Sequence, residues 1–161
     1  MRVYLAVTPR GLRKARERGW FGPGPLDAHA VTDPVRAVLD DVDEEDREYL
    51  VLSSASLDCL PLLDQHEPPV RIVVAADVDD VSPTGSEAPS AVRVAGEVPW
   101  RRVAAVHADS DDARGAVAAA RDAVRAGSED AGALVEACLD HELGWFGTQE
   151  VDDLLAALAR V

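Results

Sequence analysis

The chain has 161 residues, of which 47% are apolar and 29% charged, and its formal net charge is −14. Length and composition indicate one globular domain with its own core, and no apolar run approaches the ~20 residues of a membrane-spanning helix. The negative charge repels phosphate backbones, so neither nucleic acid nor a membrane is expected as a partner.

The opening stretch predicts a buried strand followed by a basic helix. Val3–Val7 is a short apolar run of β-formers, too short for a signal peptide, so we expect a cytoplasmic protein. Thr8 and Pro9 predict the start of the helix, and Gly19 predicts its end. The helix carries five cations, namely Arg10, Arg13, Lys14, Arg16 and Arg18.

Two interpretations of this basic helix stay open. It can present a solvated or protein-docking face, which is the interpretation we favour. Alternatively, Arg10 and Gly11 at its N-terminus can hold an anion, because a helix N-terminus attracts negative charge. The chain contains no glycine-rich loop and no complete cofactor motif there, so no cofactor is predicted.

The next segment predicts a half-exposed strand over 26–30, with His29 on its solvated face. Thr32-Asp33-Pro34 predicts a short helix to about Asp40. An acidic run then opens a longer helix over about 43–63, with Tyr49 among its core-facing positions. Pro61 is expected to kink or end that helix near Cys59.

Two apolar stretches, 70–76 and 103–107, predict central strands, and acidic residues follow both. If the strands are parallel, their acidic ends and His107 share the carboxyl edge where open sheets bind ligands. Asp77, Asp79 and Asp109 would then offer oxygen ligands to Mg²⁺. The favoured interpretation is that Asp109 caps the following helix while Asp77 and Asp79 begin a polar loop.

Residues 81–90 are predicted to form a long loop, and residues 91–95 a strand. This strand either pairs with 103–107 in a hairpin or does not pair with it. Helices are expected from there to the end. Apolar spacing predicts helices over about 113–126 and from about 131 onward, and a last helix near 151–158.

The C-terminal stretch 140–150 combines His141, Glu142, Trp145 and Gln149. His141 and Glu142 are candidates for general acid–base catalysis, with His107 as a third catalytic candidate if it faces them. Cys138 and His141 also have zinc-ligand spacing, although two further ligands would be needed. The favoured interpretation is a bend between helices in which Trp145 fills the core, and in which both cysteines are free and buried.

The whole chain resembles a family of small uncharacterised proteins from high-GC actinobacteria. The segments that carry the resemblance are Met1–Leu5, Arg71–Val78, Val103–Asp109, His141–Leu143, Trp145 and Thr148–Glu150. Gly144 and Gly147 depart from the Leu and Ala expected there. The resemblance implies no activity, substrate or catalytic residue.

The predicted fold is one α/β or α+β domain, with a mixed sheet of about five strands, helices packed on it and a helical C-terminal third. The first functional hypothesis is a binding or adaptor protein that self-associates, for example as a homodimer, or docks on a protein partner through the basic helix. The alternative is a small hydrolase or transferase that acts on an anionic metabolite at the carboxyl edge of the sheet.

Overall fold

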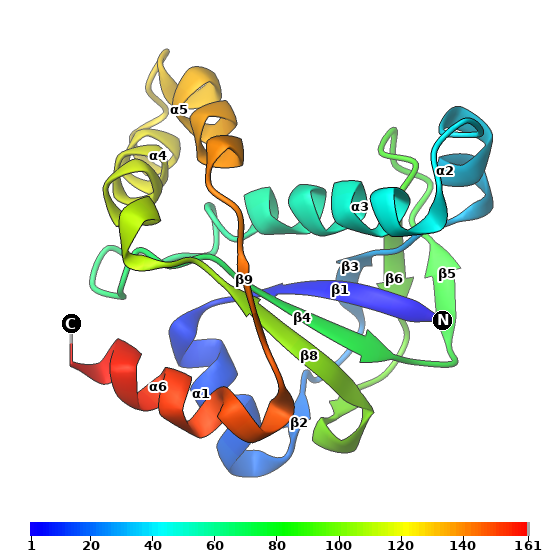
Figure 1. Ribbon diagram of the computed structural model, residues 1–161, viewed down its shortest axis with the longest axis horizontal. Coiled ribbons are helices and arrows are strands. Elements are labelled where there is room, and N and C mark those ends of the chain that lie inside the picture. The colour runs from blue at the N-terminus through cyan, green and yellow to red at the C-terminus, as the bar shows by residue number, and fades with distance from the viewer. Residues whose placement is uncertain (161) are drawn as a thin grey trace.

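A computed structural model describes residues 1–160, and its central element is a seven-stranded sheet in which every neighbouring pair is antiparallel (Figure 1). In spatial order the strands are β5 (Val81–Pro83), β6 (Ala91–Val94), β3 (Leu26–His29), β1 (Arg2–Val7), β4 (Ile72–Asp77), β8 (Val103–Ala108) and β9 (Gly144–Phe146). A separate ribbon pairs β2 (Trp20–Phe21) with β7 (Val98–Pro99).

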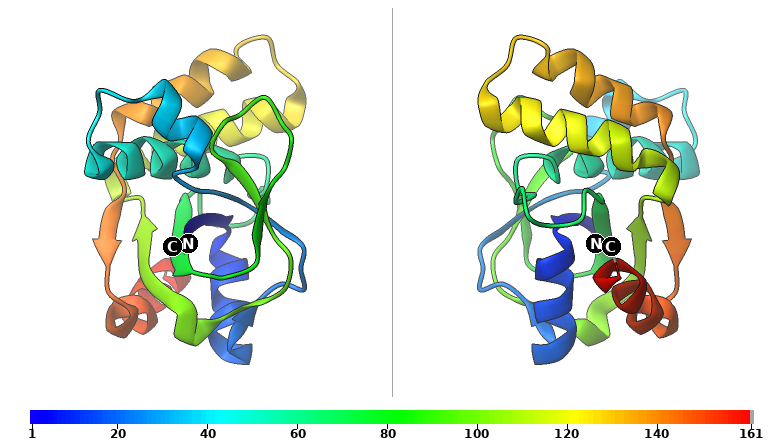
Figure 2. Two further views of the ribbon diagram at one scale, coloured as in Figure 1. Left: turned by 90° about the vertical axis from the view of Figure 1, so that its right-hand side faces the viewer. Right: turned by 90° about the vertical axis from the view of Figure 1, so that its left-hand side faces the viewer.

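Helices cover both faces of the sheet. One face carries α1 (Pro9–Arg18) and α6 (Val151–Ala159), and the other carries α2 (Asp33–Val38) and α3 (Glu44–Asp58), as Figure 1 shows. The hairpin of α4 (Arg114–Ala126) and α5 (Ala131–Ala137) lies beyond one end of the sheet, and the loop that joins the two helices reaches the top of both views of Figure 2. No helix within residues 1–160 is long and apolar enough to cross a membrane.

Strand alternation sorts the core into two faces. Val3, Leu5 and Val74 point toward α1 and α6, whereas Tyr4 and Val73 point toward α2 and α3. A third cluster under the α4–α5 hairpin contains Leu60, Leu63, Ala113, Val117, Ala120 and Cys138. The central strands are therefore buried on both faces, which explains why they read as continuous apolar runs.

Helix ends follow the local sequence signals. The hydroxyl of Thr8 accepts from the N–H of Gly11 at 2.9 Å, and Gly19 ends α1 with φ of 90°. α3 begins after Asp43, whose carboxylate accepts from the N–H of Asp46 at 2.9 Å, and it ends at Asp58, before Pro61. These boundaries confirm the signals read at Thr8, Gly19 and Pro61.

The fold is α+β, and its sheet has two more strands than the five expected. The additional strands are short: β5 lies in the segment read as a loop, and β9 lies where a bent helix was expected. β6 pairs with β3 and β5 instead of β8, so the hairpin alternative for 91–107 is wrong. Strands of three residues contain too little alternation to be recognised from sequence.

Candidate functional site

The stretch 140–150, which is rich in polar and aromatic residues, contains the edge strand β9 of the sheet. Residues Cys138–Asp140 make a single 3-10 turn, and β9 then pairs on one side only, with β8. Its register places Trp145 opposite His107 and Phe146 opposite Val106. Within residues 1–160 no strand pairs with the other side of β9, so part of its backbone is open to hydrogen bonding.

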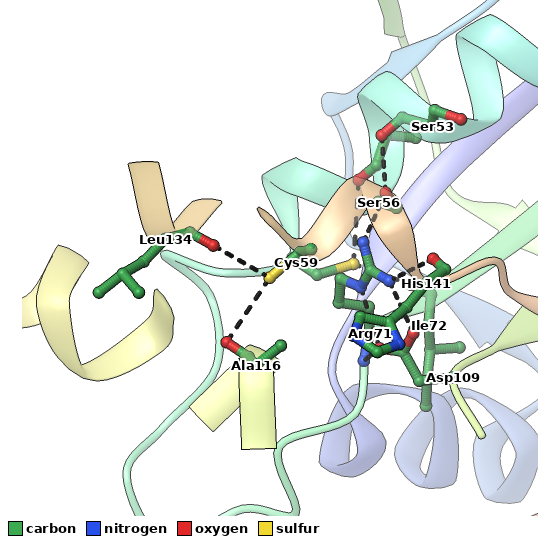
Figure 3. Close-up of polar contacts among 11 residues, drawn as sticks. Ser53, Ser56, Cys59, Arg71, Ile72, Asp109, Ala116, Leu134 and His141 are labelled. Carbon is green, nitrogen blue, oxygen red and sulfur yellow. Dashed lines mark hydrogen bonds and ion pairs between the residues drawn. The ribbon is translucent and has the colours of Figure 1, made fainter. Parts of the chain in front are cut away.

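A buried ion pair holds the chain where it approaches this edge (Figure 3). Arg71 directly precedes β4, and its Nη2 donates to the carbonyl oxygen of His141 at 2.9 Å and to Oδ1 of Asp109 at 2.8 Å. Nη1 of Arg71 donates to the hydroxyl of Ser56 on α3 at 3.3 Å. One guanidinium therefore joins a helix, two strand ends and the segment leading to β9.

Trp145 points away from the core. Its side chain lies opposite His107 and on the same face, the one covered by α3, because Val106 and Ala108 point toward α1 and α6. The residue is 62% exposed, so the expectation that Trp145 fills the core is wrong. Phe146, on the opposite face, packs against the core cluster instead.

Side chains of α3 and β8 contact the segment that contains Trp145. Tyr49 of α3 is 46% exposed, although it was expected to face the core, and its hydroxyl donates to Oε1 of Glu142 at 3.4 Å. His107 is half-buried, and burial followed by the charge of Arg2 lowers its pKa. We call Trp145, His107, Tyr49 and Glu142 the edge surface.

The segment of the chain that contains β9 is acidic. Eight Asp and Glu residues, and no Lys or Arg, lie between Arg125 and Arg160. Among them, Asp140 and Glu142 are exposed beside β9. The combination of an exposed indole and carboxylates favours a cationic group on whatever binds there, since a cation is attracted both to the face of an indole and to a carboxylate.

The catalytic candidates of the sequence do not form a proton-transfer group. No hydrogen bond within residues 1–160 joins His107, His141 and Glu142 to one another. His141 contributes its carbonyl oxygen to Arg71, and Glu142 contacts Tyr49. Of the three, only His107 and Glu142 belong to the edge surface, and only His107 lies opposite Trp145.

The acidic strand ends lie at opposite ends of the sheet because β4 and β8 are antiparallel. Asp77 pairs with Arg2 at 2.8 Å, Asp79 pairs with Arg102 at 3.1 Å, and Asp109 is committed to Arg71. Within residues 1–160, no group of three or more His, Cys, Asp or Glu side chains is placed to hold a metal ion. The shared carboxyl edge on which the metabolite hypothesis depended is absent from the described sheet.

The N-terminus of α1 is already in contact with an anion of the chain itself. Oε1 of Glu67 accepts from the N–H of Arg10 at 2.9 Å, while Thr8 takes the N–H of Gly11. The proposed place for an external anion at Arg10 and Gly11 is therefore filled by Glu67. The sequence showed no link between Glu67 and a helix start 57 residues earlier.

The cations of α1 are also used within the chain. Arg16 pairs with Asp152 of α6 at 3.0 Å, and Arg13 donates to the carbonyl oxygen of Leu155 at 3.0 Å. Arg18 stacks over the ring of Trp20, 3.8 Å from its centroid. Much of this basic helix therefore serves the contact between α1 and α6.

Arg71, which anchors the segment leading to β9, was not among the residues predicted from the sequence. A signal was present, because an arginine inside the apolar run Val70–Ala76 must find an anionic partner if the strand is buried. Its partner Asp109 lies 38 residues away, and it was read only as a helix cap or a metal ligand.

Comparison with known proteins agrees with the resemblance. No curated protein and no solved structure matches the chain. A model of a family of unknown function (DUF6912) matches residues 1–155, which include every strand and the edge surface. The chain belongs to this family.

Proposed function

We propose that this protein is a cytoplasmic binding module that captures an extended, positively charged segment of a protein partner at β9 and the edge surface. The observation that carries the proposal is the exposure of Trp145 on a strand with an open edge. Edge strands are usually protected by a charged side chain or a proline. β9 has neither, since its sequence is Gly144-Trp145-Phe146.

Backbone pairing supplies part of the binding energy. An extended segment that adds to β9 forms main-chain hydrogen bonds in the manner of an additional strand. Because β9 has only three residues, few such bonds form, and side-chain contacts must provide the rest. Trp145 is suited to this role, because tryptophan is enriched among the residues that dominate binding energy.

The negative charge of this chain favours a basic partner over a second copy of the same chain. Two copies joined through β9 would bring the carboxylates of Asp140 and Glu142 from both chains to one interface, and each chain carries a charge of −14. A lysine or arginine of a different partner instead meets carboxylates and the face of Trp145. The basic helix α1 is a weaker candidate for docking, because Arg13, Arg16 and Arg18 already have partners within the chain.

The cytoplasm fits this role, because Cys59 and Cys138 are both free and buried. Free thiols are normal in a reducing compartment, whereas secreted proteins usually pair theirs. Fusion to a compartment-specific reporter in the source cell tests this placement, and export of the protein would contradict it.

The binding test uses synthetic strands as probes. Isothermal titration calorimetry measures binding of a peptide that alternates lysine and valine, with a glutamate–valine peptide of equal length as the charge control. We expect saturable binding of the lysine peptide alone, and Trp145→Ala should weaken it by about tenfold or more. The matched control is Trp20→Ala, which removes an indole that stacks on Arg18, away from β9.

Backbone pairing has its own readout. Amide hydrogen exchange of Gly144–Phe146 should slow when the lysine peptide is bound. Equal binding of both peptides, or unchanged binding by Trp145→Ala, would disprove the proposal. Light scattering would also contradict the proposal if it showed a dimer that Trp145→Ala breaks. In that case a second copy of this chain, and not a segment of another protein, would bind at β9.

A further inference from the structure

Two short hydrogen bonds link Ser90, His29 and Asp58 in a chain. The group lies toward the edge of the sheet opposite β9. Oγ of Ser90 lies 2.8 Å from Nδ1 of His29, and Nε2 of His29 lies 2.7 Å from Oδ2 of Asp58. The three residues come from the loop before β6, from β3 and from the last turn of α3. His29 is 8% exposed, so the prediction of a solvated histidine is wrong.

The hydrogen bonds determine which nitrogen of His29 carries the proton. The carboxylate of Asp58 only accepts, so Nε2 of His29 is the protonated nitrogen. Nδ1 then has a free lone pair and accepts from the hydroxyl of Ser90. A serine bonded to a histidine base, which a carboxylate orients in turn, is the arrangement that activates a serine nucleophile. The two ring nitrogens have exchanged places relative to the usual triad.

A cavity adjoins this group. It measures about 230 Å³, and His29 and Ser90 line it together with apolar side chains of α2 and α3, among them Val35, Leu39 and Val51. Val38 and Leu50 also line it and are 70% and 43% exposed, so they mark its mouth. A cavity of this size and lining accepts a short aliphatic chain beside the hydroxyl of Ser90.

The position of Ser90 does not depend on its hydroxyl. Its carbonyl oxygen accepts from the N–H of Ala30 at 2.9 Å, and the carbonyl oxygen of the preceding Pro89 accepts from the hydroxyl of Thr32 at 2.6 Å. The backbone therefore holds Ser90 beside the cavity. The N–H of Ser90 has no acceptor within residues 1–160.

We propose that Ser90, His29 and Asp58 form a serine hydrolase site for neutral esters of short aliphatic acids. Oγ of Ser90 attacks the ester carbonyl carbon while its proton passes to Nδ1 of His29. The bond to the alcohol then breaks, and the leaving oxygen takes that proton. Water attacks the acyl-serine with His29 again accepting a proton, which returns to Oγ as the acid leaves. Ester and water are consumed, and acid and alcohol are formed.

The residues around the group select the substrate. Asp58, which is 60% exposed, stabilises the protonated ring of His29 and keeps it oriented. The net charge of −14 disfavours anionic esters, and the small cavity disfavours long acyl chains. The N–H of Ser90 donates to the oxygen on which negative charge develops.

Labelling of the unmodified protein provides a test that does not depend on a variant. A fluorophosphonate reagent should add one phosphonyl group to the peptide that contains Ser90, as read by mass spectrometry. Denatured protein is the control and should not react. Absence of label at Ser90 in the folded protein would overturn the proposal.

Turnover provides the second test. The p-nitrophenyl ester of butyrate should be hydrolysed faster than that of octanoate or of the anionic hemisuccinate. Ser90→Ala should lower kcat/KM by roughly 10³-fold or more while its melting curve stays near that of the parent, and Asp58→Asn should lower kcat with little change in KM. Ser86→Ala, in the same loop, is the matched control and should retain full activity. Full activity of a folded Ser90→Ala variant would overturn the proposal.

Discussion

Arg71 and Asp109 form a two-point ion pair in the interior of the protein. Nη2 of Arg71 donates to Oδ1 of Asp109 at 2.8 Å, and Nε donates to Oδ2 at 2.9 Å. Their side chains are 1% and 0% exposed. Burial by itself lowers the pKa of the Arg71 guanidinium, but the hydrogen bonds and charge of Asp109 outweigh that effect, and the net shift is upward. The guanidinium of Arg71 is therefore charged at all physiological pH values.

Breaking this pair should destabilise the fold strongly. Asp109→Asn leaves the Arg71 charge buried without its counter-charge, which typically costs about 3–5 kcal/mol. Urea denaturation measures the loss. Asp27→Asn is the matched control, because Asp27 and Arg93 are 76% and 51% exposed and such surface pairs contribute about 1 kcal/mol or less. A similar loss in the two variants would contradict this account of Arg71.

Both cysteines should be inert in the folded protein. Burial raises the pKa of the Cys59 thiol to about 12 and also raises that of Cys138. Because only a thiolate reacts with disulfide reagents, neither should be modified at pH 8 until the chain unfolds. A colorimetric thiol assay with and without denaturant measures this. Rapid modification of a thiol in native protein would show that the interior around it opens readily.

His107 should make stability fall in acid. Burial, followed by the charge of Arg2, lowers its pKa in the folded state below the ordinary value of 6.5. The unfolded chain therefore takes up the proton first as pH falls, and the free energy of unfolding decreases from about pH 6.5 down through the folded pKa. Well above pH 6.5 the imidazole of His107 is neutral in both states, so it no longer changes the free energy of unfolding with pH.

This pH dependence is checked by urea denaturation of the parent and of His107→Gln between pH 5 and 8. The free energy of unfolding should fall more in the parent than in the variant in the acidic half of the range. Near pH 8 it should change with pH equally in both proteins. Direct NMR titration of the His107 ring should give a midpoint below 6.5. A midpoint above that value would contradict the prediction.

Trp145 and its neighbour Phe146 should differ sharply in their effect on stability. Trp145 is 62% exposed, so Trp145→Ala should change the free energy of unfolding by no more than about 0.5 kcal/mol. Phe146 packs against the core cluster on the opposite face, and Phe146→Ala should cost more than about 1 kcal/mol. Equal losses would show that Trp145 is structural, which would remove the main support for a binding role.

Long apolar runs and local end signals were predictable because their causes lie within a few residues. Val3–Val7 and Val70–Ala76 contain enough successive apolar residues to identify the strands β1 and β4. Thr8, Pro9 and Gly19 define the ends of α1 through bonds within one turn. Strand direction has no such local cause, and the prediction of a ligand edge depended on it.

The candidate sites were harder to predict, because each depends on partners that are distant in the chain. Arg71 and Asp109 are 38 residues apart, and His29 and Ser90 are 61 apart. His29 alternates with apolar neighbours as a solvated residue would, and it is buried only because α3 and the loop before β6 cover it. Trp145 appeared to be a core residue by its type, and only the edge position of β9 exposes it.

Sequence alone was sufficient to predict a sheet with helices packed on it, the central strands, the ends of α1 and the acidic character of the chain. These properties follow from composition and from contacts between residues close in sequence. The tertiary structure alone decided that β4 and β8 are antiparallel, that Glu67 occupies the N-terminus of α1, and that Ser90 meets His29. These arrangements depend on packing between segments that are distant in the chain. The hydrophobic pattern of one segment does not show which distant segment packs against it.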